Sequence, residues 1–337
     1  MKRTVYLLVT IILITYGYQA YKAVSEHLND RIKIKMKGVL SDITDKVASI
    51  PLETPDSSEV TNVKRVLKDE DNIFLISNNR LLHYDISGKF KNHIARDVAE
   101  NDEYIRSYTL NVEQRQVIVI DSQRNILTYS YNGNFISKKT LSHQWQKISA
   151  LEFYNGYLWA AAETYVKSND SENSYKIVNK LFKIDYQMNI VSETVLKTVD
   201  VGRKQMLNFG YATEILSGED GLYAYSSPYN MKYLLEDTLH ILQQKKIPVL
   251  HIGEIFGSGC IYNVRRGGRF FISNNGFTFC YDDRNHTAYQ LNKGFKDNFF
   301  DTGFVSDLQP VDVYCNTYCY MNTAENATNL YIFTLKA

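Results

Sequence analysis

The sequence repeats one short pattern: an apolar strand, a few residues, a second strand, and then a polar turn rich in Tyr, Asp and Gly. Residues 84–90, Tyr-Asp-Ile-Ser-Gly-Lys-Phe, return about 45 positions later as residues 129–135, Tyr-Ser-Tyr-Asn-Gly-Asn-Phe. Looser copies occupy residues 184–190 and 281–285. A repeat of this length that is built from strands is typical of a β-propeller, in which small antiparallel sheets form a ring.

The second strand of each repeat is the clearest marker of how many repeats there are. Six short apolar and aromatic runs lie about 50 residues apart on average, which is the spacing of propeller blades. The runs are residues 72–76, 116–120, 156–160, 221–225, 269–273 and 316–320. The sequence therefore predicts an all-β chain that folds as a six-bladed β-propeller.

The two ends of the repeat region indicate how the ring closes. An unpaired edge between the first and last blades would leave many backbone groups without hydrogen bonds. The last repeat ends at residues 331–335 with three strands, while residues 48–54 precede the first complete repeat. We therefore predict that residues 48–54 form the outermost strand of the sixth blade, where Pro51 is tolerated because one side of that strand needs no donor.

Composition agrees with a β fold and excludes one class of partner. The chain has 26 Tyr and 16 Phe but only 5 Pro, and aromatic residues favour the half-buried surface of a sheet. Thirty-eight basic and 37 acidic side chains leave a net charge of +1. Because no overall field attracts a polyanion, we expect no nucleic-acid partner.

The amino terminus has the features of an export signal. Basic residues at positions 2 and 3 precede an apolar run over residues 5–18, which is shorter than the roughly 20 residues that span a bilayer. No well-spaced cleavage site follows, so both a signal peptide and an uncleaved membrane anchor stay open. We assign residues 1–23 to that segment, 24–47 to a linker or arm, and 48–337 to the propeller. We expect the chain to be exported across the inner membrane, as a periplasmic or membrane-anchored protein of the cell envelope.

The alternating residues 31–37 and the four cysteines each allow two interpretations. In residues 31–37, basic and apolar side chains alternate, which predicts an edge strand or arm with a solvated face, or alternatively contact with anionic lipid. The cysteines fit either a Cys315–Cys319 disulfide across a tight turn or small buried side chains on strands. All four lie in the last third of the chain: Cys260, Cys280, Cys315 and Cys319.

The residues after position 38 resemble a known family. Residues 40–43 (Leu-Ser-Asp-Ile), residues 50–54 (Ile-Pro-Leu-Glu-Thr), the repeated turns and the ending at residues 329–336 are similar to the six-bladed β-propeller family of Bacteroides and related bacteria, relatives of NHL-repeat propellers. Family members carry a Gly-Pro-rich loop that ends in Glu-Tyr before the second blade. This chain keeps Glu103 and Tyr104 but lacks the glycines over residues 96–102. The resemblance implies an exported envelope protein of a Bacteroidota-type organism.

No contiguous motif of phosphate, serine-hydrolase, zinc-protease or redox chemistry occurs in the sequence. Propeller sites are assembled from single residues, so we expect ligand-binding side chains on the connections that enter each inner strand. Aromatic and Arg side chains there suit a planar or sugar-like ligand. The candidates are Glu103, Tyr104, Arg106, Trp145, Arg203 and Phe256. The sequence identifies no catalytic residue, metal ligand or cofactor.

Two hypotheses follow for function. The first is a noncatalytic binding or scaffolding module that presents its loop-rich face to a glycan, a peptide or a partner protein in the cell envelope. The alternative is a metal-dependent hydrolase or lyase that resembles gluconolactonases and paraoxonases, with a divalent metal in the central channel. The alternative requires several oxygen or nitrogen ligands that converge on one point.

Overall fold

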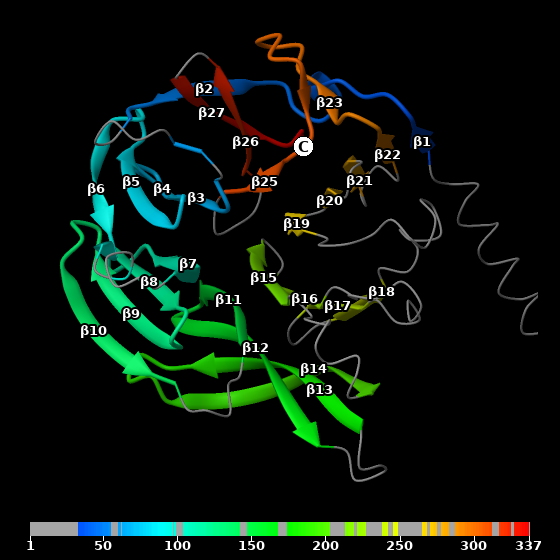
Figure 1. Ribbon diagram of the computed structural model, residues 1–337. Coiled ribbons are helices and arrows are strands. Elements are labelled where there is room, and N and C mark those ends of the chain that lie inside the picture. The colour runs from blue at the N-terminus through cyan, green and yellow to red at the C-terminus, as the bar shows by residue number, and fades with distance from the viewer. Residues whose placement is uncertain are drawn as a thin grey trace, which may run out of the picture.

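Six small antiparallel sheets are arranged in a ring in the computed structural model of the chain (Figure 1). Each sheet is one blade, and the strands nearest the centre of the ring are β3, β7, β11, β15, β19 and β25 (Figure 1). The structure describes residues 33–54, 60–61, 63–96, 98, 104–141, 147–167, 174–202, 213–218, 221–226, 238–241, 245–248, 265–267, 270–274, 278–282, 287–311, 317–324 and 327–336. The all-β, six-bladed architecture predicted from the repeats is confirmed.

The first three blades follow one another along the chain, each with four strands in sequence order. The first contains β3 (Val66–Lys68), β4 (Asn72–Ser77), β5 (Arg80–Asp85) and β6 (Phe90–Ile94). The second contains β7 (Ile105–Asn111), β8 (Gln116–Asp121), β9 (Asn125–Ser130) and β10 (Phe135–Thr140). The third has longer strands: β11 (Lys147–Tyr154), β12 (Tyr157–Lys167), β13 (Ser174–Ile184) and β14 (Ile190–Gly202).

The fourth and fifth blades repeat the same order of strands. The fourth contains β15 (Thr213–Gly218), β16 (Gly221–Ser226), β17 (Thr238–Ile241) and β18 (Lys245–Pro248). The fifth contains β19 (Arg265–Gly267), β20 (Phe270–Asn274), β21 (Thr278–Asp282) and β22 (Thr287–Leu291). The six apolar runs used to count repeats lie in β4, β8, β12, β16, β20 and, in the last blade, β26.

The sixth blade combines strands from both ends of the described chain. Its strands are β25 (Gln309–Pro310), β26 (Thr317–Ala324), β27 (Ala327–Thr334) and β2 (Val47–Leu52). The outermost strand β2 pairs antiparallel with β27, from Val47 opposite Phe333 to Leu52 opposite Thr328. Residues 48–54, predicted as the outermost strand of this blade, thus supply most of β2.

Contacts between neighbouring inner strands join the blades into a ring. Strand β7 contacts β11, β11 contacts β15, β15 contacts β19, β19 contacts β25, and β25 contacts β3. The first two blades are joined through Tyr108, whose hydroxyl donates hydrogen bonds to the carbonyl oxygens of Phe74 at 2.8 Å and Arg65 at 3.3 Å. Buried Leu, Ile, Val and Tyr side chains fill the spaces between adjacent sheets. The inner strands are therefore held at fixed positions around the axis.

The described part of the amino-terminal arm packs on the fifth and sixth blades. Strand β1 (Lys33–Lys35) extends the fifth blade by pairing parallel with β22, so the edge strand predicted from the alternating residues is confirmed. The 3₁₀ turn η1 (Leu40–Asp42) follows, and Leu40 lies buried in the core between these two blades. Residues 1–32, which include the predicted signal or anchor helix, lie outside the described residues. Among the described residues, no helix combines the length and apolar character needed to cross a bilayer.

A short hairpin that the repeat pattern did not predict lies between the fifth and sixth blades. It is formed by β23 (Phe295–Lys296) and β24 (Phe304–Val305). The buried side chain of Asp297 organises its loop: one carboxylate oxygen accepts the backbone N–H groups of Phe299 and Phe300, and the other accepts the hydroxyls of Thr302 and Tyr320. Because Tyr320 belongs to β26, this carboxylate attaches the hairpin to the sixth blade.

The repeated Gly of the polar turns has a packing role. Gly88, with φ of +88°, lies in the turn between β5 and β6, and a Cβ added there would stand 2.0 Å from the carbonyl oxygen of Pro51 in β2. Gly133, with φ of +81°, occupies the same place in the second blade, where a Cβ would stand 2.8 Å from the carbonyl oxygen of His93 in β6. In both blades this turn rests on the outermost strand of the preceding blade. The third copy has Met188 at this position, with φ of +62°.

Two of the four cysteines are described, and both lie in strands. Cys280 in β21 and Cys319 in β26 are buried, as expected for small apolar side chains in a sheet. Cys280 forms no disulfide, and burial raises the pKa of its thiol. Cys260 and Cys315 lie outside the described residues, so the alternative Cys315–Cys319 disulfide stays a prediction.

Candidate functional site

Two of the six predicted ligand-binding residues are described. Tyr104 lies just before β7 and is exposed, and Arg106 is the second residue of that strand, with its guanidinium 5.4 Å from the centre of the Tyr104 ring. The structure thus brings these two together at the entrance to the second blade. The other four lie outside the described residues: Glu103, Trp145, Arg203 and Phe256.

The inner strands of four blades share a polar network inside the ring. Arg65, just before β3, donates a hydrogen bond from Nη2 to Glu152 Oε2 of β11 at 2.9 Å. The same guanidinium contacts the Ser107 hydroxyl of β7 at 3.2 Å through Nη1. Glu152 Oε1 accepts hydrogen bonds from both the hydroxyl and the backbone N–H of Ser217 in β15. A single carboxylate therefore links blades one, three and four, with Ser107 of the second blade between them.

Glu152 is an unusual residue for this position, because its side chain is only 2% exposed. Burial raises the pKa of its carboxyl group, while the Arg65 charge and the hydrogen bonds from Ser217 favour the ionised form. A buried carboxylate of this kind is stable only with such partners. The network therefore serves to fix the inner strands relative to one another, and it cancels the charge of Arg65.

A cavity of about 170 Å³, here called the channel mouth, is lined in part by Arg65 and Ser107 of this network. Its walls come from the inner parts of five blades: Lys64, Arg65, Ile76, Arg106, Ser107, Ser149, Ala150, Ile215, Leu216, Gln309 and Pro310. Arg106, a ligand-binding candidate from the sequence, is among these lining residues. Three of the lining side chains are cationic, and Glu152 neutralises one of them.

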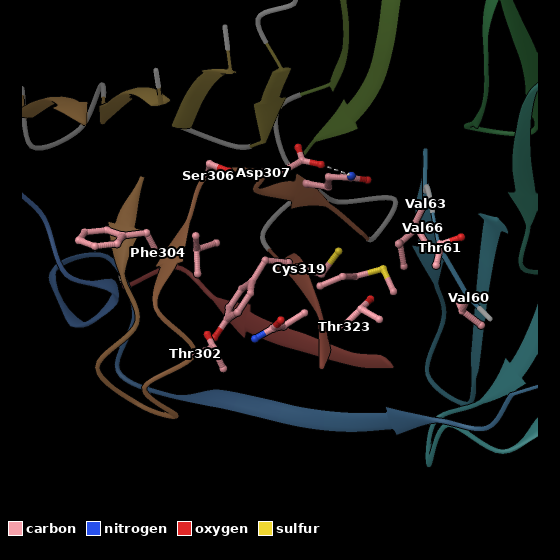
Figure 2. Close-up of a pocket in the computed structure, with 15 residues that line it drawn as sticks. Val60, Thr61, Val63, Val66, Thr302, Phe304, Ser306, Asp307, Cys319 and Thr323 are labelled. Carbon is pink, nitrogen blue, oxygen red and sulfur yellow. Dashed lines mark hydrogen bonds between the residues drawn. The ribbon is translucent and has the colours of Figure 1, made fainter. Parts of the chain in front are cut away.

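A second and larger cavity, here called the cleft, has a volume of about 360 Å³ and lies where the first and sixth blades meet (Figure 2). One wall is the connection from β2 to β3, with Val60, Thr61 and Val63, and the floor includes Cys319 and Met321 of β26. The hairpin β23–β24 forms the opposite wall. Figure 2 shows Thr302 and Phe304 on that side and Val60 and Thr61 across the cleft.

The cleft and the channel mouth share one residue, Gln309 of β25. The Gln309 amide nitrogen donates a hydrogen bond to Asp307 Oδ2 at 2.9 Å, drawn as a dashed line in Figure 2. This bond fixes the orientation of the amide and leaves its oxygen available as an acceptor. The two cavities are therefore adjacent parts of one polar surface at the entrance to the inner strands.

A third cavity, of about 170 Å³, lies between the second and third blades. It is lined in part by Ile136 and Ser137 of β10 and by Tyr186 and Met188 of the third polar turn. It occurs where Met188 replaces the Gly that lets the corresponding turns of the first two blades rest on their neighbours. We attribute this cavity to blade packing.

The described residues give no metal centre and one structural histidine. No group of three or more His, Cys, Asp and Glu side chains in the described ranges is arranged to hold a metal ion. His83 bonds to Asn72 and Asn92 at 2.8 Å through its two ring nitrogens and stacks on Phe74, and burial lowers its pKa. The metal-dependent hydrolase alternative stays a prediction, which metal analysis of the purified protein can test.

Sequence reasoning missed several residues of this surface. Arg65 precedes the inner strand of the first blade, in a place equivalent to that of Arg106 in the second blade, but it lies before the first blade and so not on a connection between two consecutive repeats. Glu152 carried a signal, because it is an acidic residue inside the apolar run of residues 150–153. Phe304 had none, because the hairpin that carries it has no counterpart in the other repeats.

Comparisons with known proteins agree with this architecture. A family model described as a 6-bladed beta-propeller matches residues 24–234. The crystal structure of a Bacteroides fragilis protein described as exported has a TM-score of 0.58 and 13% sequence identity, over 90% of this chain and 98% of that one. The β-propeller domain of Myceliophteria thermophila Cps50 (Swd1) has a TM-score of 0.43 and 9% identity, over 84% and 99% of the two chains. No curated protein matches the sequence.

At 13% sequence identity, the similarity to the Bacteroides structure shows a shared fold. The resemblance to Bacteroides-type propellers that the sequence motifs indicated is confirmed. Because the family model spans more than half of its length, the chain belongs to the 6-bladed β-propeller family.

Proposed function

We propose that this protein is a noncatalytic binding module of the cell envelope, which holds a glycan, a peptide or a partner protein at the cleft and channel mouth. The observation that carries the proposal is the junction of these two cavities at Gln309. Their lining side chains come from five blades, so the rigid ring holds them in place before a ligand arrives. Such preorganisation reduces the entropy lost on binding.

The volumes of the cavities indicate the size of what they hold. Ligand pockets in proteins have volumes of roughly 300–1,000 Å³. The cleft, at about 360 Å³, lies in this range and suits a small molecule or one to two units of a polymer. The channel mouth, at about 170 Å³, is below it and suits a single chemical group of a ligand.

The location in the cell envelope rests on the amino terminus. Residues 1–18 combine a basic start with an apolar run, which is the pattern of an export signal. The Bacteroides protein of similar fold is described as exported, which agrees with this proposal. Fractionation of cells that produce the full-length chain tests it: a chain found only in the cytoplasm would contradict the proposed location.

The binding function is tested by variants of the surface. Full-length protein is screened against glycan and peptide arrays, and each ligand found is titrated against Arg106→Ala, Asn322→Ala and Thr323→Ala. Tyr186→Ala, an exposed side chain at the third polar turn, is the control. We expect weaker binding by the three surface variants and unchanged binding by the control. Ligands that bind all four proteins as tightly as wild type would defeat the proposed surface.

A further inference from the structure

We infer that the ligand is an acidic saccharide, with a sugar ring in the cleft and a carboxylate bound by Arg106 in the channel mouth. The inference rests on the proposed function and names the class of ligand at the same surface. Three observations support it: the Arg106 guanidinium has an unpaired donor, the cleft is lined mostly by polar side chains, and Gln309 lines both the cleft and the channel mouth.

Arg106 lines the channel mouth and has unused hydrogen-bonding capacity. Its Nε atom is buried and has no hydrogen-bond partner in the described part of the protein. Its Nη2 atom lies 3.5 Å from the Ser122 carbonyl oxygen, which is the outer limit of a hydrogen bond. Buried donors without partners are rare in folded proteins, so we expect this guanidinium to turn and present its fork to an acceptor that enters the mouth. A planar carboxylate matches the fork through two parallel hydrogen bonds.

The charge balance of the channel mouth favours an anion. Glu152 cancels the charge of Arg65 through the 2.9 Å ion pair. Among the described lining residues, Lys64 and Arg106 then remain without a carboxylate partner. A neutral ligand would leave both positive charges uncompensated, whereas a carboxylate would neutralise one of them in a partly desolvated site where the interaction is strong.

The lining of the cleft favours a ligand rich in hydroxyl groups. Small-molecule pockets are usually lined predominantly by apolar side chains. Here eight of the fifteen lining residues carry polar side chains: Thr61, Thr302, Ser306, Asp307, Gln309, Tyr320, Asn322 and Thr323. Phe304 lies on the hairpin side of the cleft with 56% of its surface exposed, and its ring points away from the residues across the cleft (Figure 2), so the polar side chains provide most of the contacts open to a ligand.

Gln309 connects the two parts of the proposed site. It lines both cavities, and its bond to Asp307 sets the amide so that the oxygen is free to accept. A ring hydroxyl next to the carboxylate-bearing carbon of the sugar is the group that this oxygen would bind. The ligand would thus span the cleft and the mouth with one continuous set of polar contacts.

The experiment uses matched pairs of disaccharides. One member of each pair carries a carboxylate where the other carries a hydroxymethyl group, and each is titrated into the full-length protein by calorimetry. We expect the acidic member of at least one pair to bind about 10- to 100-fold more tightly, the factor typical of a charge-assisted hydrogen bond. Arg106→Gln should remove this preference, so that the acidic and neutral members of the pair bind with about equal affinity. Arg115→Gln, an exposed Arg stacked on Tyr131 in another turn, should have no effect.

Each outcome separates the ligand class from the proposed function. Equal binding of both members, or an Arg106→Gln variant that keeps the preference, overturns the inference while saccharide binding still stands. Binding of peptides alone, if weakened by cleft variants, overturns the saccharide class and leaves the binding surface in place. Melting curves of each variant verify folding. If Arg106→Gln does not fold, Lys64→Gln replaces it, because Lys64 is exposed, and a smaller loss of the acidic preference is expected.

Discussion

Arg65 of the first blade and Glu152 of the third blade form a 2.9 Å ion pair inside the ring, although 87 positions separate them in the sequence. We expect Arg65→Met to lower the free energy of unfolding by about 3–5 kcal/mol, because the buried carboxylate loses its countercharge. Chemical denaturation monitored by fluorescence measures the change. The double variant Arg65→Met/Glu152→Leu should recover much of the loss, since no charge is then left buried.

The exposed ion pair between Lys180 and Glu193, with a similar distance of 3.0 Å, provides the control. Glu193→Gln should change the free energy of unfolding by less than about 1 kcal/mol, because solvent screens this pair. Equal losses at the two pairs would contradict the importance given to burial.

Asp297 is expected to hold the hairpin β23–β24 in place. Asp297→Ala removes the acceptor for Phe299, Phe300, Thr302 and Tyr320, and should lower the free energy of unfolding by about 3 kcal/mol. Limited proteolysis should cut the variant first within residues 297–305. Cleavage elsewhere, with this segment still protected, would show that the hairpin is held by other contacts.

The same residue predicts a pH dependence. Burial opposes ionisation of Asp297, but the hydrogen bonds from Thr302, Phe299, Phe300 and Tyr320 outweigh it and hold the pKa below its usual value of 3.8. The stability that Asp297 contributes is therefore fully present above about pH 4 and is lost as the pH falls through the lower folded-state pKa. Wild type should lose this contribution in acid, while Asp297→Ala should show a shallower decline. Parallel acid curves for the two proteins would refute the assignment.

Gly88 tests the packing of the repeated turns. Gly88→Ala should lower the free energy of unfolding by about 2–5 kcal/mol, because the new Cβ meets the Pro51 carbonyl and the backbone is left-handed. Gly156→Ala is the matched control: its φ is +74°, but a Cβ there has nothing within 4 Å, so only about 1 kcal/mol is expected. Thermal denaturation of both variants measures the difference, and equal losses would show that steric contact with β2 is unimportant.

The pairing of β2 with β27 predicts the effect of removing each amino-terminal strand. Deletion of Val47–Leu52 should abolish cooperative unfolding, because β27 loses its partner and the buried Val47 and Leu52 leave the core. Deletion of Lys33–Lys35 should cost much less, because β1 only extends the edge of the fifth blade. A β2 deletion with an unchanged melting temperature would be incompatible with the observed strand order.

The number of blades and the positions of many strands were predictable because the apolar runs and polar turns that mark them are local and recur along the sequence. The apolar runs at residues 72–76 and 116–120 became β4 and β8 since short apolar strands with a polar turn at fixed spacing have few other stable arrangements. The position of residues 48–54 followed from the missing fourth strand of the last repeat. Both inferences used only spacing and the need to pair backbone groups.

The candidate site was predictable only in part. Arg106 was named as a candidate because it lies beside the connection that enters β7, whereas the Arg65–Glu152 pair depends on a distance between blades that no spacing in the sequence encodes. The hairpin β23–β24 is an insertion without a repeat, so the wall of the cleft that carries Phe304 could not be inferred from the other blades. Sites assembled from single residues of several repeats are visible only once the ring is formed.

The cleft also has a thermodynamic consequence. Val60, Thr61 and Val63 come from the beginning of the ring, and Met321, Asn322 and Thr323 come from its end, so a bound molecule would join the two segments whose association completes the fold. Its binding free energy would add directly to the resistance of that junction to opening. Saturating ligand should therefore raise the unfolding temperature most in variants whose closing strand has been weakened. Ligand binding and ring closure would then be coupled to the same opening equilibrium of the junction between the first and sixth blades.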